Sequence, residues 1–389
     1  MRRKFADFNY ITFFAMLLLI ATGTVAIWSA GHAREVIFHG MWLNNIQSAA
    51  VGLAVYFALA LFDYRKYLPI TAPFAYLAAV LMLVMVLLLG SEIYGGKRWL
   101  WFFQPSEISK LCVIAFLAQL FGRDEDDIMG GWFRGFKGFL VGAILAAVPI
   151  ALILIEPDLG TALVLAPAIA TVLLAAGVWR KGLLTIIALG ALAAALLLGA
   201  VYEAEKPGQS DVRREQIERW LPLRPHQLKR VKTFLFPDTD PTGAGYNGKQ
   251  AMIAIASGGF SGKGIGKGET NALQYLPQSV SMNDFIFCVY AEETGYIGAL
   301  VLLGLFAALC LSGVWTAYFA SDLMGRLLSL GVVMLIFAHV YINIAMSIGL
   351  VPITGLPLPF ISSGRTFLLT VMAALGLTQS VAIHREEQT

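Results

Sequence analysis

The sequence predicts an all-α polytopic membrane protein with about ten transmembrane helices, in one membrane domain that spans residues 1–389. Hydrophobic residues make up 58% of the chain and charged residues 14%, and the mean hydropathy is +0.72. Soluble domains usually contain about 25% charged residues, so this composition excludes a water-soluble fold. Apolar runs of roughly 20 residues, the length that a spanning helix needs, also recur along the whole chain.

The apolar runs form two groups separated by a long polar connection. Seven runs lie within residues 1–202, and three lie within residues 285–389, which end in a short tail. The connection between the seventh and eighth runs covers residues 203–284 and is the large insertion of the chain. The predicted helices begin near Ile11, Ile46, Ile70, Ile108, Phe136, Ala162, Leu183, Phe285, Leu327 and Thr366.

Basic residues in the short loops predict the orientation, because lysine and arginine are retained on the cytoplasmic side. With the N-terminus inside, the short outer loops carry only Arg34, Lys97, Arg98 and Arg365. We therefore expect both termini in the cytoplasm and the connection 203–284 outside. The inner ends of the helices carry Arg2, Arg3, Lys4, Arg65, Lys66, Arg123, Arg134, Lys137, Arg180, Lys181, Arg326 and Arg385.

Lys110 is the one lysine or arginine inside the long apolar runs, and Glu107 precedes it by one helical turn. An unpaired charge at membrane depth is costly, so such residues normally pair and face a cavity or the bundle interior. They mark a functional site by default. The pair therefore predicts chemistry or transport.

Several other classes of site are excluded by composition and spacing. Cys112, Cys288 and Cys310 all lie in apolar runs, and neither they nor the five histidines show the spacing of metal ligands. The metal-binding residues are therefore unknown. A net charge of +3 without a basic stripe argues against nucleic acid. A lipid is the more natural partner.

The connection 203–284 contains two candidate features. Asp211–Trp220 has the helical spacing of an interfacial amphipathic helix. Ser257–Gly268 is rich in glycine but fails as a P-loop, because neither Lys263 nor Lys267 is followed by serine or threonine. Freed backbone amides beside these lysines would suit a diphosphate. A turn-rich loop without a ligand is an equally good interpretation.

Asp284 opens the eighth apolar run, and two roles are open to it. It could cap the helix, with its side chain accepting hydrogen bonds from exposed amides. Glu292 and Glu293 lie about 12 Å further along the same helix, at a rise of 1.5 Å per residue. Three carboxylates exceed the needs of capping, and a partly desolvated carboxylate can act as a general base.

Ordered motifs span nearly the whole chain, namely Gly96-Lys-Arg-Trp99, Gln104-Pro-Ser-Glu-Ile-Ser-Lys110, Glu156-Pro-Asp-Leu-Gly160, Pro225-His-Gln-Leu-Lys-Arg230, Asp240-Pro-Thr-Gly-Ala-Gly-Tyr246, Asp284-Phe-Ile-Phe287, Ala291-Glu-Glu-Thr-Gly295 and Pro352-Ile-Thr-Gly-Leu-Pro-Leu-Pro-Phe-Ile-Ser362. Taken together, these motifs resemble those of the SEDS proteins (shape, elongation, division and sporulation), which polymerise peptidoglycan. The form Thr354-Gly-Leu-Pro-Leu-Pro resembles the rod-shape (RodA) branch more than the division (FtsW) branch.

The resemblance implies a ten-helix peptidoglycan glycosyltransferase that joins lipid II units into glycan strands at the outer face of the bacterial inner membrane. It casts Asp284 as the base that deprotonates the acceptor sugar's 4-hydroxyl. A divalent cation, Mg or Mn, is implied as a helper. So are an undecaprenyl-diphosphate-linked glycan and a class B penicillin-binding protein as partners. The expected substrate-binding residues are Arg98, Lys110 and Arg230 as cations for the leaving group, Glu107 orienting Lys110, Asp158 lining the cavity, and Lys263 and Ser362.

Three features depart from the family pattern. Pro277-Gln-Ser-Val-Ser-Met-Asn-Asp284 lacks the glutamate and histidine that usually precede the catalytic aspartate, and Arg365 occupies a site that normally holds a small residue. The third and mildest departure is Asn247, which follows Gly245-Tyr246 where the family usually has glutamine. Two other functions therefore stay open. A flippase for a lipid-linked precursor would use the Glu107 and Lys110 pair for headgroup passage. A non-catalytic scaffold would only activate a penicillin-binding protein.

Overall fold

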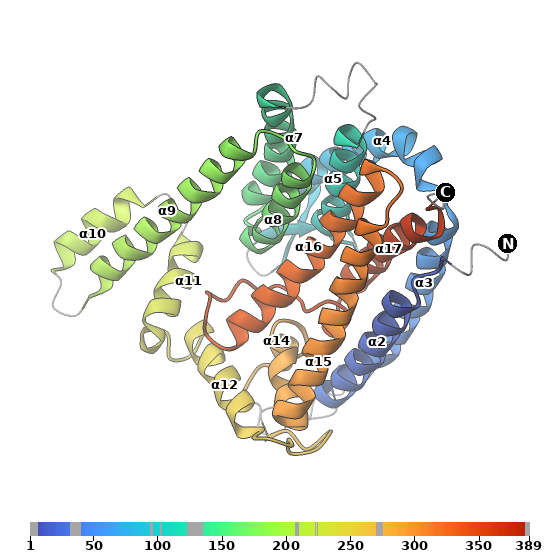
Figure 1. The fold of residues 1–389 in the computed structure, drawn as a ribbon. Helices are drawn as coiled ribbons and strands as arrows, with labels where there is room; N and C mark the ends of the chain where they lie inside the picture. Colours follow the sequence, from blue (N-terminus) through green and yellow to red (C-terminus); the bar gives the residue numbers. More distant parts are fainter. Residues whose placement is uncertain are drawn as a thin grey trace.

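The computed structural model describes residues 7–31, 40–93, 96–101, 103–122, 135–206, 210–221, 223, 225–269 and 275–385. Within these ranges the chain is a bundle of helices with one small hairpin (Figure 1). Six of the basic residues used for the orientation lie outside the described residues, namely Arg2, Arg3, Lys4, Arg34, Arg123 and Arg134.

Ten apolar helices occur where the hydropathy predicted them, each beginning within about six residues of the predicted position. Eight are long enough to cross a membrane, and α5 and α8 have 17 residues each. The prediction of a polytopic helical membrane protein is thereby confirmed. The ten are α2 Tyr10–Gly31, α3 Met41–Leu61, α4 Tyr64–Leu89, α5 Pro105–Phe121, α7 Phe136–Ile155, α8 Leu159–Ala175, α9 Arg180–Glu205, α15 Ile286–Tyr318, α16 Leu323–Ser347 and α17 Arg365–Ile383.

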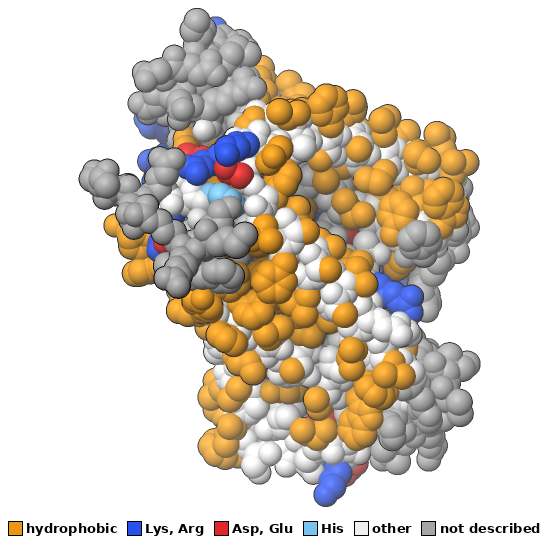
Figure 2. Space-filling view, turned by 90° about the vertical axis from the view of Figure 1, so that its right-hand side faces the viewer, with side chains coloured by type: hydrophobic (Ala, Val, Ile, Leu, Met, Phe, Trp, Pro, Cys, Tyr) orange, Lys and Arg blue, Asp and Glu red, His pale blue; other side chains and the backbone are white. Residues whose placement is uncertain are grey.

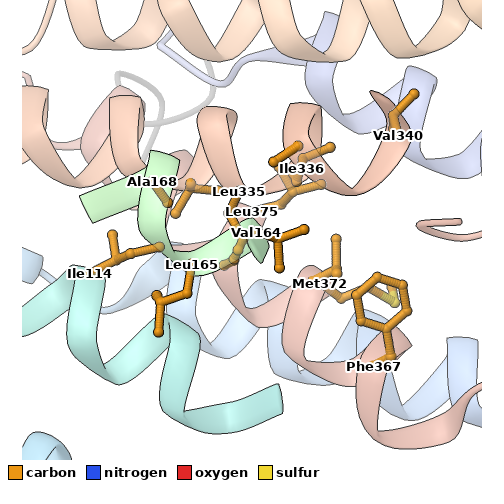
Figure 3. Packing of buried hydrophobic residues seen from close by; sticks show 14 of the residues in the cluster. Ile114, Val164, Leu165, Ala168, Leu335, Ile336, Val340, Phe367, Met372 and Leu375 are labelled. Atoms are coloured by element: carbon orange, nitrogen blue, oxygen red, sulfur yellow. The ribbon is translucent and has the colours of Figure 1, made fainter. Parts of the chain in front are cut away.

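The centre of the bundle is formed by α16 and α17. In their most apolar 18-residue stretches 67% and 83% of residues are buried, against 6% in α9. Figure 3 shows α5, α8, α16 and α17 meeting through Ile114, Leu165, Leu335 and Leu375. In contrast, α9 extends away from the bundle together with α10 (Figure 1). Most of α9 is therefore not covered by the rest of the chain, whereas α16 contacts protein on most sides.

The surface agrees with a membrane setting. Hydrophobic side chains are spread over the described part of the face seen in Figure 2, and the few charged side chains there lie towards its edges. Exposed residues such as Leu88, Leu89 and Phe74 are 70% or more accessible. A water-soluble monomer rarely exposes continuous apolar surface on this scale. The bilayer supplies the apolar surroundings that these side chains need.

The hairpin adds one feature that the sequence analysis did not anticipate. Strands β1, Ser91–Ile93, and β2, Gly96–Trp99, pair antiparallel between α4 and α5, with a register shift beside Ser91. Arg98, one of the predicted substrate-binding residues, therefore lies on a hydrogen-bonded strand.

The connection 203–284 contains several short helices. Its first helix confirms the predicted helix at Asp211–Trp220, while its location at the membrane interface stays a prediction. The elements in order are α10 Asp211–Trp220, α11 Pro225–Leu235, the 3-10 turn η2 Pro237–Thr239, α12 Ala244–Ser257 and α14 Gln278–Asn283.

Candidate active site

The candidate site lies where four connections at one end of the bundle meet. Because the helices alternate in direction, the connections after α4, α7, α9 and α16 share that end. They contribute Arg98, Asp158, Arg230 with Asp284, and Thr354 respectively. Arg230 is attracted electrostatically by Asp284 and Asp158 and is repelled by Arg98, so all three of these charged groups are within electrostatic range of Arg230. The site is thus assembled from segments that are far apart in sequence.

Asp284 lies at the junction between α14 and α15. Its amide donates to the carbonyl of Val280 at 3.0 Å, which ends α14. The N-cap position of α15 is Phe285, and no side chain caps that helix end. The capping role considered for Asp284 is therefore not realised, and its half-buried carboxylate points elsewhere: a Cβ atom on Gly355 would lie 3.4 Å from Oδ2.

Burial raises the pKa of Asp284 to about 6, while Arg230 and, more weakly, Arg98 hold it lower. A carboxyl group with a pKa near 6 is mostly ionised at neutral pH yet is more basic than a solvated aspartate. That combination is what a general base requires, since it must be deprotonated but still bind a proton well.

Two guanidinium groups accompany this carboxylate. Nη1 of Arg230 on α11 donates to the carbonyl of Thr354 at 3.0 Å, and burial lowers the pKa of Arg230, with Arg98 adding to the effect. Arg98 on β2 donates through Nη2 to the carbonyl of Pro157. Both arginines are half-buried, and each is held by a backbone carbonyl. The site therefore combines a base with two oriented cations.

Three consecutive residues of the connection between α16 and α17 unite these groups. The carbonyl of Thr354 binds Arg230, Gly355 lies against the carboxylate of Asp284, and the carbonyl of Leu356 accepts a hydrogen bond from Asn343 at 2.7 Å. Gly355 has φ +74, a conformation that glycine adopts without strain. Thr354 and Leu356 are buried against protein, whereas Gly355 between them is exposed, so a substrate can approach the backbone at that point.

Asp158 lies beside the site, but its carboxylate is occupied. It caps α8, with Oδ1 accepting from the amide of Thr161 at 3.1 Å and Oδ2 accepting from the hydroxyl of Thr161 at 2.9 Å. Nε2 of Gln104 donates to Oδ2 at 3.2 Å. Asp158 therefore orients the start of α8, a role that the expected cavity lining did not include.

Glu156 is a site residue that the sequence analysis overlooked, although it stands in the quoted motif beside Asp158. It is fully buried, and within the described structure neither carboxylate oxygen has a hydrogen-bond partner. Burial raises its pKa to about 8, Asp158 adds to this, and Arg98 opposes it. At neutral pH its carboxyl group is mostly protonated, so it adds little charge to the site.

Lys110 is enclosed in the bundle. Its ammonium lies 2.8 Å from Oε2 of Glu107 and 2.9 Å from Nε2 of His339 on α16, and it stands 5.3 Å above the ring of Phe367 on α17. The side chains of Lys110 and Glu107 are 1% and 5% exposed. The structure therefore surrounds Lys110 with protein groups, because α16 and α17 pack around it, and its expected contact with the leaving group stays a prediction.

His339 is the second residue that sequence reasoning missed. The sequence around His339 gives no indication of a functional role, because its partner Lys110 lies 229 residues away. The hydrophobic pattern of the ninth apolar run could have shown only that a polar residue was buried there.

Ser362 also has a structural role where substrate contact was expected. Its hydroxyl donates to the carbonyl of Asn283 at 2.6 Å and accepts from the amide of Leu358 at 2.8 Å, and the residue is 3% exposed. The amide of Ser363 adds a bond to the carbonyl of Met282. Ser362 therefore clamps the end of α14, and with it the position of Asp284.

Lys263 lies away from this group of residues and pairs with carboxylates. Its ammonium is 2.8 Å from Oε1 of the buried Glu292 and 3.4 Å from Oε2 of Glu269. The ammonium of Lys263 is therefore paired with carboxylates in this structure, and its expected contact with a diphosphate stays a prediction.

The glycine-rich loop, residues 257–268, forms hydrogen bonds with the backbone of α15 where that helix is interrupted. At Gly295, α15 departs from helical geometry with φ 68 and ψ −166. The amides of Lys263 and Gly264 donate to the carbonyls that the break leaves free, at 3.1 and 2.9 Å, and the amide of Tyr296 donates to the carbonyl of Gly259. The loop amides that were considered as a phosphate cradle therefore serve the helix.

The described residues contain no group of three or more His, Cys, Asp or Glu side chains that could hold a metal ion. They therefore do not form a cage for a divalent cation.

Comparisons with known proteins agree on one family. The model of the FtsW/RodA/SpoVE cell cycle proteins matches residues 9–387. The chain is 33% identical over 376 residues to the peptidoglycan glycosyltransferase MrdB of Escherichia coli K12, covering 95% of this chain and 92% of MrdB. It is 28% identical to the peptidoglycan glycosyltransferase RodA of Treponema pallidum, covering 97% and 98%.

A solved structure extends the likeness to the fold. It is described as "Structural coordination of polymerization and crosslinking by a peptidoglycan synthase complex". This chain matches it with a TM-score of 0.73 and 27% identity, over 98% of this chain and 99% of the other.

Proposed function

Because the chain belongs to the FtsW/RodA/SpoVE family of cell cycle proteins, we propose that it is a peptidoglycan glycosyltransferase. It polymerises lipid II into glycan strands at the outer face of the bacterial inner membrane, and these strands are used for cell elongation and shape. The observation that carries this proposal within the chain is the position of Asp284, a half-buried carboxylate set against Gly355 with Arg230 and Arg98 close by.

Asp284 is the general base in this proposal. It takes the proton from the 4-hydroxyl of the acceptor sugar, and the resulting oxygen attacks the anomeric carbon of the donor. The bond from that carbon to the diphosphate then breaks, and its electron pair leaves with the diphosphate-lipid. The raised pKa of Asp284 supports this role, since a base with a pKa near 6 accepts a proton better than a solvated aspartate does.

Arg230 and Arg98 stabilise the leaving group. Negative charge grows on the diphosphate as its bond to the sugar breaks, and cations already held in place lower that barrier without reorganising. The backbone carbonyls of Thr354 and Pro157 hold the two guanidinium groups. Donors remain on each group for a phosphate, because a guanidinium has five N–H groups.

A divalent cation enters this proposal only with the substrate. Mg²⁺ in such sites commonly takes its ligands from substrate phosphates, waters and one or two carboxylates. Asp284 could supply one carboxylate ligand. The chemistry that the cation would add is neutralisation of charge on the diphosphate.

The proposed partner is a class B penicillin-binding protein that cross-links the strands. The matched solved structure is of a peptidoglycan synthase complex in which polymerisation and crosslinking are coordinated, and this supports such an assembly. The proposed orientation has both termini in the cytoplasm, which places the Asp284 group at the outer face. The distribution of basic residues in the short loops supports this orientation, and the four connections that build the site share one face of the bundle.

The flippase alternative loses its main argument. It depended on Glu107 and Lys110 offering a polar path for a headgroup. Both side chains are at most 5% exposed, and Lys110 is occupied by Glu107 and His339. A polar path would require these contacts to break.

The test is polymerisation of purified lipid II by the chain co-purified with its penicillin-binding protein, whose transpeptidase serine is disabled. Asp284→Asn removes the base while keeping the size of the side chain, and should lower the rate by about 10²–10⁴-fold. Asp238→Asn is the matched control, because Asp238 is a 90% exposed carboxylate in the same connection. Strand formation by Asp284→Asn at the wild-type rate would reject the proposal.

A further inference from the structure

Asn343 is a fully buried polar residue on α16 that makes two hydrogen bonds with the site. Its Nδ2 donates to the carbonyl of Asp284 at 2.9 Å and to the carbonyl of Leu356 at 2.7 Å. Both partners are carbonyl oxygens, which can only accept, so the amide nitrogen must face them. Both hydrogens of the NH₂ group are thereby used.

The two carbonyls belong to the two halves of the site. Asp284 carries the base, while Leu356 is the third residue of the segment whose first residue, Thr354, holds Arg230. Between them, Gly355 lies against the carboxylate of Asp284. One side chain therefore bonds the backbone of the base and the backbone of the segment that positions the cation.

The helix that carries Asn343 is suited to this task. α16 is among the most buried helices of the bundle. His339 lies one turn before Asn343 on the same face of α16, and it contacts Lys110 of α5. Ser347, one turn after, donates to the carbonyl of Asn343 at 2.8 Å. Asn343 thus stands on an element that packing holds in place.

We propose that Asn343 is a positioning residue for the transfer reaction, setting the separation between the Asp284 carboxylate and the Arg230 guanidinium. The inference rests on the proposed function. A misplacement of about 1 Å in a reacting group can cost about 100-fold in rate. Few other side chains could replace the amide, because the position needs two donors directed at two acceptors within a buried space.

The experiment measures kcat and KM for lipid II with Asn343→Ala and Asn343→Asp in the complex with the partner. Asn343→Ala removes the donors, and Asn343→Asp keeps the size but turns a carboxylate oxygen towards two carbonyl oxygens. We expect kcat to fall by about 10–100-fold in both variants and KM to change by less than about threefold. Ser329→Ala is the matched control, since Ser329 is a fully buried polar residue on the same helix.

The pH profile separates positioning from a general loss of folding. In Asn343→Ala, water gains access to the loosened Asp284 carboxylate, so the midpoint of the acid limb should move to lower pH. A purely structural residue would lower the yield of folded protein and leave both the profile and kcat per folded molecule unchanged. If Asn343→Ala does not fold, kcat of the isosteric Asn343→Asp variant tests the positioning role, which predicts a fall and is contradicted by the wild-type value.

The outcome is distinct from failure of the proposed function. Wild-type kcat in a folded Asn343 variant, alongside an inactive Asp284→Asn, would overturn only the positioning role. An active Asp284→Asn would overturn the proposed function first, and the positioning role with it.

Discussion

The ammonium of Lys110 lies 2.9 Å from Nε2 of His339, at a point where both residues are at most 1% exposed. The sequence places these residues on different apolar runs, and only the packing of α5 against α16 brings them together. With Glu107 on one side and Phe367 above, the ammonium has protein partners in several directions. Lys110, the one basic residue inside the long apolar runs, thus links α5 to α16 and α17 in the interior of the bundle.

This arrangement predicts that Lys110→Met destabilises the protein. Removing one partner of a buried ion pair leaves the other charge uncompensated, which costs about 3–5 kcal/mol. The double variant Glu107→Gln with Lys110→Met should recover most of that loss, and thermal unfolding in detergent measures both. Lys66→Met is the control, because Lys66 is 75% exposed in its pair with Asp63. Unchanged unfolding of Lys110→Met, with a large rise in KM, would return Lys110 to the role of a substrate cation.

The rate of polymerisation should depend on pH through Asp284. Its raised pKa of about 6 means that the active, deprotonated form is lost as pH falls through that value. Arg230 favours the charged carboxylate, so Arg230→Gln should raise this pKa and move the acid limb of kcat to higher pH. Lys229→Gln, an exposed neighbour on α11, should leave the limb in place. A shift to lower pH in Arg230→Gln would contradict the assignment.

Gly355→Ala should impair the reaction more than it impairs folding. The added methyl group lies 3.4 Å from Oδ2 of Asp284, where a substrate hydroxyl would have to approach, and the residue has φ +74. Gly349→Ala carries a similar backbone strain at φ +73 in the same connection, but its neighbour is Met252. Comparing kcat and unfolding temperature of the two variants separates strain from obstruction. Equal losses of kcat would show that strain alone is responsible.

Lys263→Met should loosen the glycine-rich loop without weakening substrate binding. It leaves the carboxylate of Glu292, which is 1% exposed, without its ammonium partner. We expect faster proteolysis within residues 258–268 and an unchanged KM for lipid II. Lys267→Met, at an exposed lysine of the same loop, should alter neither quantity. A rise in KM for Lys263→Met without faster proteolysis would restore the phosphate-binding hypothesis.

The sequence by itself determined the number of apolar helices, the start of each to within about six residues, and which connections share a face of the membrane. These are local properties, because a segment of about 20 apolar residues in lipid must satisfy its own backbone hydrogen bonds and therefore forms a helix. The sequence motifs also pointed to Asp284 and to Arg230, which the structure places together.

Only the tertiary structure decided what the remaining polar residues contact. Lys110 with His339, Lys263 with Glu292, Ser362 with Asn283, and Asn343 with Asp284 are pairs separated by 229, 29, 79 and 59 residues. A single sequence shows that each residue is polar in an apolar setting, and burial then demands a partner for it. It does not show which partner, because the choice depends on how helices distant in sequence pack against one another.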